Sequence, residues 1–136
     1  MPKMLGARYL AELLVAYGVK AIFFKPSILS KMLAQMDDLP IRRIHTHGEK
    51  AAAYMADGYA RASGRPGVCA AQTVGAGNLA AGLRDAYMAH SPVISMIGGR
   101  FGATKHKGAY QEVDDYPMFA PVTKANLQVD EVGRIP

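Results

Sequence analysis

Short apolar segments that alternate with helical segments constrain the fold of this chain more than any other feature of its sequence. Apolar residues recur at helical spacing over residues 5–17, and a strand-type run follows at residues 19–24. The order repeats, with further helices expected at residues 28–36, 49–62 and 79–90 and further strands at residues 41–45, 68–72 and 93–97, the last of them of the buried type. Such alternation predicts an α/β fold, a three-layer doubly wound parallel sheet with helices on both faces.

The remaining segments are expected to be loops at residues 73–78 and 98–115 and a last strand at residues 122–129. A loop as long as the second one is typical of functional segments in compact domains. Residues 130–136 have the pattern of the start of a further helix. We therefore expect a single domain over residues 1–136 that is a fragment or a subunit of a larger protein.

The carboxyl ends of the parallel strands are the expected place for a ligand, because folds of this kind bind ligands there. Four segments should meet at this edge, namely residues 24–27, 45–49, 72–78 and 98–111. Glu49, Gly75 and Gln111 lie in three of them. Residues that are distant in the sequence are therefore expected to share one edge of the sheet.

The composition limits the classes of function. The formal net charge is +5, but no basic stripe with interleaved aromatic residues occurs, so no nucleic-acid partner is expected. The sequence has no uninterrupted apolar run of about 18 residues and no signal peptide at its amino end, which predicts a soluble, cytoplasmic protein with no membrane partner. Cys69 is the single cysteine, which excludes an intramolecular disulfide, and its apolar neighbours in the sequence indicate a buried side chain.

Glu49 stands at a predicted strand-to-helix junction and allows two interpretations. In the first, its carboxylate only stabilises the helix, since a negative charge in the first turn contributes about 0.3–1 kcal/mol. In the second, the carboxylate projects from the ligand-binding edge into an apolar cleft, where it can share a proton with a substrate or cofactor nitrogen. The spacing of residues alone leaves both interpretations open.

A metal site at the same junction is the next alternative. His45 and His47 point to the same side if the strand continues through them, and with Glu49 they offer three ligands. The His-x-Glu pattern also occurs in zinc deaminases, but the paired cysteines of that class are absent here. We predict no metal ligands in this chain.

Glycines after the third predicted strand satisfy a loose dinucleotide-binding pattern, with Gly75, Gly77 and Ala80 at the required spacing. No acidic residue lies between Asp85 and Glu112, however, so the carboxylate that would bind a ribose is missing. The glycines are better interpreted as positions where a ligand or another backbone approaches the start of a helix closely.

Gly58 lies inside a strongly helical segment, where glycine costs about 0.5–1 kcal/mol relative to alanine. Ala52, Ala53 and Ala56 are its small neighbours on the helix. A face of small residues suits close packing against another helix, either in this chain or in a second subunit.

One run of residues, EKAAAYMADGYAR at residues 49–61, resembles the pyrimidine-binding domain of thiamine diphosphate enzymes of the acetolactate synthase and benzoylformate decarboxylase group. The resemblance continues in the expected order through residues 64–68, 75–79, 82–87, 91–94, 110–114 and 121–124. It implies a flavodoxin-like thiamine diphosphate-binding fold, and it makes residues 1–136 a single pyrimidine-binding domain.

The resemblance also implies roles for particular residues. Glu49 matches the glutamate that hydrogen-bonds N1′ of the cofactor's aminopyrimidine ring and thereby activates the cofactor. Gly75 and Asn78 match the segment that borders the cofactor's reacting end, and Gln111 matches a glutamine on a mobile active-site loop. Pro26 matches the proline of a Gly-x-Pro-Gly motif that lies at the cofactor.

Two positions depart from the family pattern. The Gly-x-Pro-Gly motif is replaced by FKPS at residues 24–27, and Gly48 stands where a histidine commonly precedes the glutamate. Lys25 within the first of these segments is interpreted either as a contact for an acidic substrate or as an exposed lysine without that role.

The function that the resemblance implies is that of a thiamine diphosphate-dependent lyase or transferase, a decarboxylase or carboligase that acts on a small 2-oxo acid. The chain has no Gly-Asp-Gly motif followed by Asn-Asn, with which the family binds Mg²⁺ and the diphosphate. A diphosphate-binding domain of the same or another polypeptide is therefore the implied partner, in a homodimer or homotetramer, and the isolated domain is expected to be inactive. The alternative is a non-catalytic assembly or regulatory module that retains the fold.

Overall fold

The computed structural model describes residues 3–25, 29–99 and 102–135. Its strands are β1 (Ala21–Phe24), β2 (Arg42–His45), β3 (Gly67–Gln72) and β4 (Val93–Gly98). Its α-helices are α1 (Gly6–Ala16), α2 (Ser30–Ala34), α3 (Glu49–Ser63), α4 (Thr73–Met88) and α5 (Tyr116–Phe119). Short 3₁₀ turns occur at Gly102–Thr104, Ala120–Val122 and Val132–Arg134. The expected alternation of strands and helices is thus confirmed from the amino end of the chain to β4.

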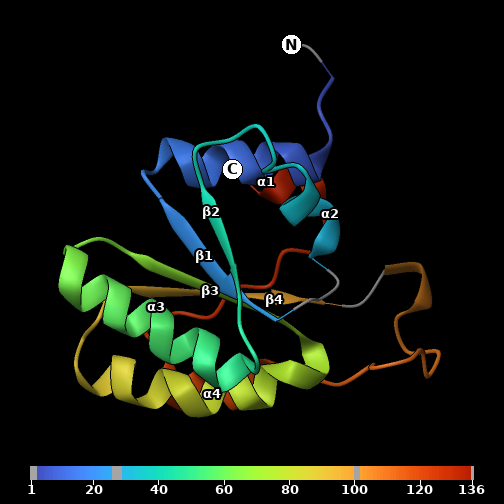
Figure 1. Ribbon diagram of the computed structural model, residues 1–136. Coiled ribbons are helices and arrows are strands. Elements are labelled where there is room, and N and C mark those ends of the chain that lie inside the picture. The colour runs from blue at the N-terminus through green and yellow to red at the C-terminus, as the bar shows by residue number, and fades with distance from the viewer. Residues whose placement is uncertain (1–2, 26–28, 100–101, 136) are drawn as a thin grey trace.

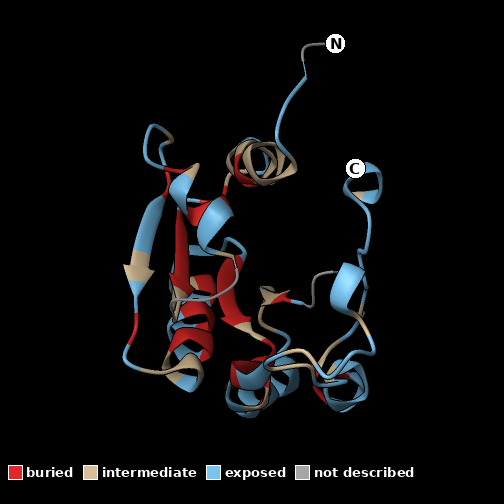
Figure 2. Ribbon diagram, turned by 90° about the vertical axis from the view of Figure 1, so that its right-hand side faces the viewer, coloured by how far each residue is buried: buried red, intermediate tan, exposed pale blue. Residues whose placement is uncertain are grey.

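The four strands form a parallel sheet in the order β2-β1-β3-β4, with α1 and α2 on one face and α3 and α4 on the other (Figure 1). Successive residues of a strand point to opposite faces. Accordingly, Ile22 and Val68 join the core beneath α1 and α2, whereas Phe23 and Cys69 join the core beneath α3 and α4. Figure 2 shows the buried residues concentrated in the central strands and in the helix faces turned toward them. The three-layer, flavodoxin-like architecture is confirmed.

Cys69 behaves as the sequence predicts. Its side chain is fully buried in the sheet, and this burial raises the pKa of the thiol to about 12. Since the thiolate is the reactive form, the residue acts as a small apolar part of the core.

Within the described ranges, no helix combines the length and the apolar character that crossing a bilayer requires.

Helix α4 begins earlier than expected. Residues 73–78, predicted as a loop because of their glycines, form its first turns. Their helical conformation follows from packing, since α4 lies along α3 so closely that a Cβ added to Gly82 would be 2.7 Å from the Cβ of Ala53. Tertiary contacts of this kind override the low helix propensity of glycine.

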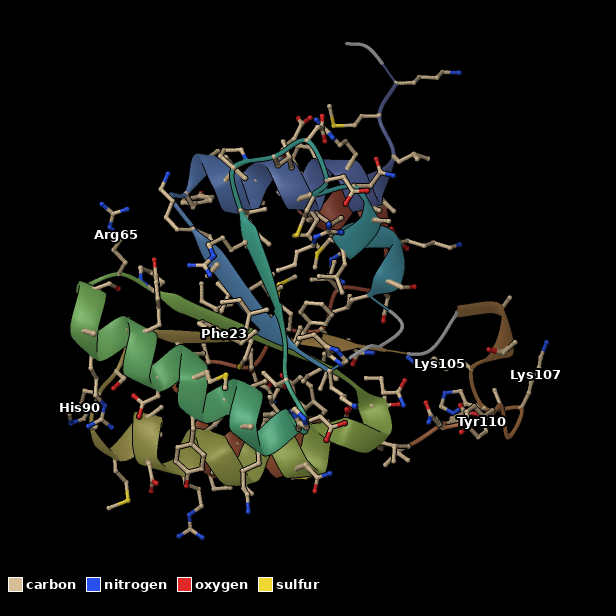
Figure 3. All side chains as sticks on the ribbon, viewed as in Figure 1. Phe23, Arg65, His90, Lys105, Lys107 and Tyr110 are labelled. Atoms are coloured by element: carbon tan, nitrogen blue, oxygen red, sulfur yellow. The ribbon has the colours of Figure 1, made fainter. Side chains whose placement is uncertain are left out.

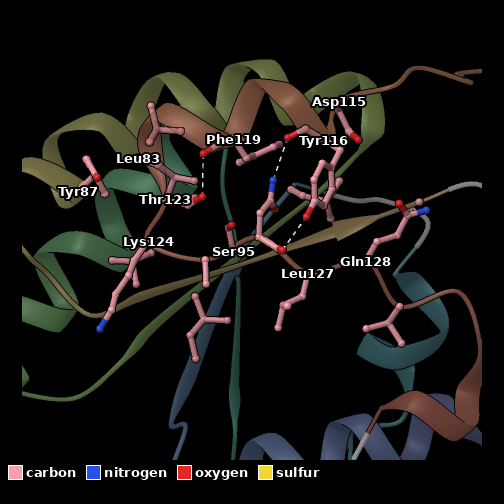
Figure 4. A pocket seen from close by; sticks show the side chains of 18 of the residues that line it. Leu83, Tyr87, Ser95, Asp115, Tyr116, Phe119, Thr123, Lys124, Leu127 and Gln128 are labelled. Carbon is pink, nitrogen blue, oxygen red and sulfur yellow. Dashed lines mark hydrogen bonds between the residues drawn. The ribbon is translucent and has the colours of Figure 1, made fainter.

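The strand predicted at residues 122–129 is wrong. The side chains of Tyr116 and Asn126 bond each other's backbone, because the Tyr116 hydroxyl donates to the Asn126 carbonyl and the Asn126 amide donates to the Tyr116 carbonyl, each at 2.8 Å (Figure 4). The Thr123 hydroxyl also donates to the Phe119 carbonyl at 2.7 Å. These bonds fold the segment against α5 and keep it away from the sheet.

Strand β4 consequently remains an edge strand and is not of the buried type. Its Ile94 side chain is 46% exposed. A groove of about 1310 Å³ separates β4 from the segment that follows α5, and residues from both sides line it (Figure 4). The groove thus runs along the edge of β4 that the strand predicted at residues 122–129 does not cover.

The small-residue face of α3 divides in two. Ala52, Ala53 and Ala56 are fully buried in the core, so this part packs within the chain. Gly58 is exposed, and a Cβ added there would have no atom within 4 Å apart from its chain neighbours and the nearby backbone of its own helix. Among the described residues nothing packs against Gly58, so this part of the small-residue face takes no part in the packing of the chain.

Asp57 is the buried charge of α3, and it generates a prediction about pH. Its carboxylate is paired with the Arg61 guanidinium through two hydrogen bonds of 2.8 Å, and this pairing lowers the pKa of Asp57. A group with a lowered folded-state pKa stabilises the fold above its unfolded pKa of about 3.9 and loses that contribution as the pH falls through the folded value. Asp57→Asn should therefore reduce the free energy of unfolding by about 1–3 kcal/mol at pH 7.

Urea unfolding at pH 7 and at pH 3 measures this effect, and the destabilisation should shrink at the lower pH. Asp114→Asn is the control, because it removes the same charge from an exposed site. An Asp57→Asn variant that is equally destabilised at both pH values would contradict the assignment.

Candidate functional site

The carboxyl ends of β1, β2 and β3 meet at one edge of the sheet. Phe24 at the end of β1 is in register with His45 of β2 and with Ala70 of β3. The strand order reverses between β1 and β3, and this switch point is where open α/β sheets bind ligands. The expected meeting of distant segments at one edge is confirmed for the described residues.

Thr46 turns the chain from β2 into α3. Its backbone N–H donates to the Phe24 carbonyl at 2.8 Å, so that the chain stays beside β1 for one residue beyond the strand. Its hydroxyl donates to the Gly48 carbonyl, also at 2.8 Å, and the residue is only 3% exposed. Glu49 is then the first residue of α3, at the edge of the sheet.

The Glu49 side chain is held against the first turns of α4. The side-chain amide of Asn78 donates to its Oε2 atom at 3.3 Å. On the other side, a Cβ added to Gly75 would lie 2.6 Å from Oε1 and 2.8 Å from Cγ of Glu49. Residues three apart lie on one helix face, so Gly75 leaves space for the carboxylate and Asn78 offers it a hydrogen bond from the same face. The carboxylate thus occupies a cradle that any larger side chain at position 75 would fill.

Gln111 reaches the same end of α4 through its backbone. The hydroxyl of Thr73, the first residue of α4, donates to the Gln111 carbonyl at 2.7 Å. Thr73 is 3% exposed, so this bond is sheltered from water. The loop that carries Gln111 is therefore tied to the helix that contacts Glu49.

The structure brings together most of the residues predicted for the site. Asn78 hydrogen-bonds Glu49, Gly75 leaves the space beside the Glu49 side chain, and the Gln111 backbone is bonded to Thr73 at the start of the same helix. Pro26, the remaining prediction, lies outside the described residues.

The histidines near Glu49 do not assemble a metal site with it. The imidazole of His45 stacks on the Phe24 ring, with ring centroids 5.8 Å apart. Across the described part of the chain, no three His, Cys, Asp or Glu side chains gather closely enough to hold a metal ion.

Thr46 and Thr73 are the residues of the candidate site that the sequence analysis missed. Both are buried, and both use their hydroxyls to bond backbone at a strand-to-helix junction. A signal was present, since a threonine between a predicted strand and a predicted helix is typical of local side-chain-to-backbone bonding. It does not reveal the partner when that partner, like Gln111, is distant in sequence.

A parallel α/β domain with this strand order is of the doubly wound class, whose ligands bind at the switch point where the Glu49 carboxylate lies. Residues 4–118 match the family described as thiamine pyrophosphate enzyme, N-terminal TPP binding domain. The chain therefore belongs to the family of thiamine pyrophosphate-dependent enzymes, as their N-terminal domain.

Relatives and a solved structure agree with this membership. The chain is 41% identical to a probable acetolactate synthase large subunit of Methanocaldococcus jannaschii, over 98% of this chain and 23% of that protein. It is 35% identical to human 2-hydroxyacyl-CoA lyase 2, over 96% of this chain and 21% of the relative. Its fold matches the thiamine diphosphate-dependent 4-hydroxybenzoylformate decarboxylase of Rhodococcus jostii RHA1 with a TM-score of 0.82 and 27% identity, over 89% of this chain and 23% of that one. The chain thus spans less than a quarter of these proteins.

The cradle of Glu49 generates a prediction about Gly75. Gly75→Ala places a methyl group where the Glu49 carboxylate now lies, so the free energy of unfolding should fall by about 1–3 kcal/mol despite the better helix propensity of alanine. Gly77→Ala is the matched control, because its Cβ would lie at an ordinary 3.6 Å from the Met118 sulfur.

A double-mutant cycle with Glu49→Ala identifies the cause, since removing the Glu49 side chain should restore most of the stability lost in Gly75→Ala. Thermal or urea unfolding of the four proteins measures the coupling. Additive effects of the two substitutions would show that the glycine is not reserved for the carboxylate.

Proposed function

We propose that this chain is the pyrimidine-binding domain of a thiamine diphosphate-dependent enzyme that decarboxylates or ligates small 2-oxo acids, with Glu49 activating the cofactor. The observation that carries the proposal is the Glu49 carboxylate set between Gly75 and the Asn78 amide at the switch point of the sheet. Of the two interpretations of Glu49, helix stabilisation alone does not account for a neighbour that lacks a side chain and a second neighbour that orients the carboxylate.

The residues present fit the aminopyrimidine end of thiamine diphosphate. Glu49 is a hydrogen-bond acceptor and proton carrier in a set orientation, which is what sharing a proton with the N1′ nitrogen requires. Bound thiamine diphosphate supplies the carbanion chemistry that breaks or forms the bond beside the 2-oxo carbon. The protein's contribution here is to hold the proton at the Glu49 carboxylate and to orient that group through Asn78.

The other site residues receive supporting roles in the proposal. Gly75 keeps the space for the carboxylate, and Asn78 fixes its direction. Gln111 lies on the loop tied to Thr73, and we place it near the reacting end of the cofactor. Pro26 follows β1, and we assign it to the cofactor's ring system on the resemblance of its segment to the family motif.

A second domain completes the proposed site. The matched family comprises the N-terminal domains of its enzymes, and the chain spans 23% of the Methanocaldococcus jannaschii relative. We propose that a diphosphate-binding domain of the same or another polypeptide holds the diphosphate and Mg²⁺. The 136 residues alone would then bind the cofactor weakly and would not turn over substrate.

Self-association is part of the proposal, as a homodimer or homotetramer. Helices α3 and α4 expose apolar side chains, including Met55 and Met88, the latter 74% exposed. Gly58 lies on α3 with open space over it, which lets another helix approach. These features support a subunit interface on this layer of the domain.

Turnover of small 2-oxo acids by the full-length polypeptide, with thiamine diphosphate and Mg²⁺, tests the role of Glu49. Glu49→Gln should lower kcat about 100-fold or more, because the amide cannot carry the proton at this position. Glu131→Gln is the control, since it makes the same chemical change at an exposed residue. Equal turnover by Glu49→Gln and wild type would contradict the assignment, whereas a wild type that binds a partner and turns over no 2-oxo acid would favour the non-catalytic module.

Gly58→Ala tests the subunit interface. The substitution should raise the free energy of unfolding of the 136-residue chain by about 0.5–1 kcal/mol, because alanine favours the helix and its methyl group meets nothing there. The same methyl group should weaken self-association of the full-length polypeptide, which sedimentation measures. Unchanged association would remove Gly58 from the interface.

A further inference from the structure

Gln111 has an unusual backbone conformation. Its φ angle is +61°, in the left-handed region that residues other than glycine rarely adopt. Such a conformation persists only where the surrounding structure imposes it, and it is common at functional sites. The contacts that impose it are therefore informative about Gln111.

Glu112 supplies the first of these contacts. One oxygen of its carboxylate accepts the backbone N–H of His106, and the other accepts the N–H of Ala109 at 3.1 Å. The Glu112 backbone N–H in turn donates to the Ala109 carbonyl at 2.9 Å. The Glu112 carboxylate thus joins both ends of the loop at residues 106–112 through hydrogen bonds to its backbone.

The closed loop stands out from the body of the domain. Lys107 and Tyr110 lie on it in Figure 3, and Tyr110 is 91% exposed. Packing of the loop's own side chains therefore contributes little to its stability, and the hydrogen bonds to the Glu112 carboxylate maintain its conformation. A carboxylate suits this task, because its two oxygens accept two amides and its charge strengthens both bonds.

Thr73 supplies the second contact. Its hydroxyl bonds the Gln111 carbonyl at 2.7 Å from the first turn of α4, two residues before Gly75. Gly75 contacts the Glu49 side chain. Glu112 shapes the loop on one side of Gln111, and Thr73 anchors it on the other.

We propose that Glu112 is a positioning residue that presents Gln111 to the active site, with Thr73 as the anchor. The Glu112 carboxylate fixes the conformation of the loop at residues 106–112, and this conformation keeps Gln111 in its left-handed backbone geometry. Thr73 then holds the Gln111 backbone at the amino end of α4, beside Glu49. The inference rests on the proposed function in one respect, namely that Gln111 acts at the reacting end of the cofactor.

Amide hydrogen exchange in the full-length polypeptide tests the geometry without reference to activity. Glu112→Ala should speed exchange of the His106 and Ala109 amides about 10-fold or more, because both lose their acceptor. Asp114→Asn is the matched control, since it removes a charge two residues away at an exposed site. Unchanged exchange of both amides in Glu112→Ala would overturn the proposal.

Steady-state kinetics test the consequence for Gln111. Glu112→Ala and Thr73→Val should each lower kcat/KM for a 2-oxo acid about 10-fold, because a small displacement of an active-site group costs at least that much. The affinity for thiamine diphosphate should stay within about twofold of wild type, and Thr73→Ser, which keeps the hydroxyl, should restore most of the turnover. An equal loss of cofactor affinity in both variants would indicate general disruption and would overturn the positioning role.

Different results would contradict the proposed function and the positioning role of Glu112. Faster exchange in Glu112→Ala together with a wild type that turns over no 2-oxo acid would support the loop geometry and contradict the proposed function. Normal turnover in Glu112→Ala, with an active wild type that depends on Glu49, would contradict only the role of Glu112.

Discussion

The close approach of α3 and α4 is the constraint on which the rest of the structure depends. At its amino end it is made possible by Gly75, which leaves room for the Glu49 side chain, and farther along by Gly82, which lies against Ala53. Because α3 and α4 approach closely at both places, one helix cannot shift along the other without a steric clash. Helix packing therefore sets where the Glu49 side chain starts, and helix packing is more rigid than a loop.

The strand ends add local restraints to this packing. Thr46 ties the start of α3 to the end of β1, and Thr73 ties the start of α4 to the loop of Gln111. Each hydroxyl donates a hydrogen bond to a backbone carbonyl, so each restraint fixes the backbone and does not occupy a neighbouring side chain. The candidate site is thus assembled from two short local links and one helix contact that joins them.

The sequence predicted the order of elements well and their ends less well. Apolar periodicity identified α1 to α4 and β1 to β4, because each of these elements buries a face that its spacing reveals. It failed for the first turns of α4 and for residues 122–129. In the first case packing against α3 overrides the glycines, and in the second the mutual bonds of Tyr116 and Asn126 replace a strand ladder.

The candidate site was predictable in part for a related reason. The rule that ligands bind at the carboxyl ends of strands placed Glu49 and Gly75 at one edge, and the resemblance to a family supplied the role that we propose for Glu49. Neither indicated that a Cβ at position 75 would meet the carboxylate, because that contact depends on the distance between two helices. The anchoring of Gln111 was hidden in the same way, since Thr73 is 38 residues away in the sequence.

The same contacts bear on the proposed division of cofactor binding between two domains. The amino end of a helix at a switch point is the usual site for a phosphate, because its N–H groups and its dipole attract an anion. In α4 that end already lies against the Glu49 carboxylate, and its first residue bonds the Gln111 carbonyl. A diphosphate placed there would meet the negative charge of Glu49 at close range. If Glu49 shares a proton with the cofactor as proposed, the same end of α4 is poorly suited to the diphosphate, which agrees with the proposed second domain.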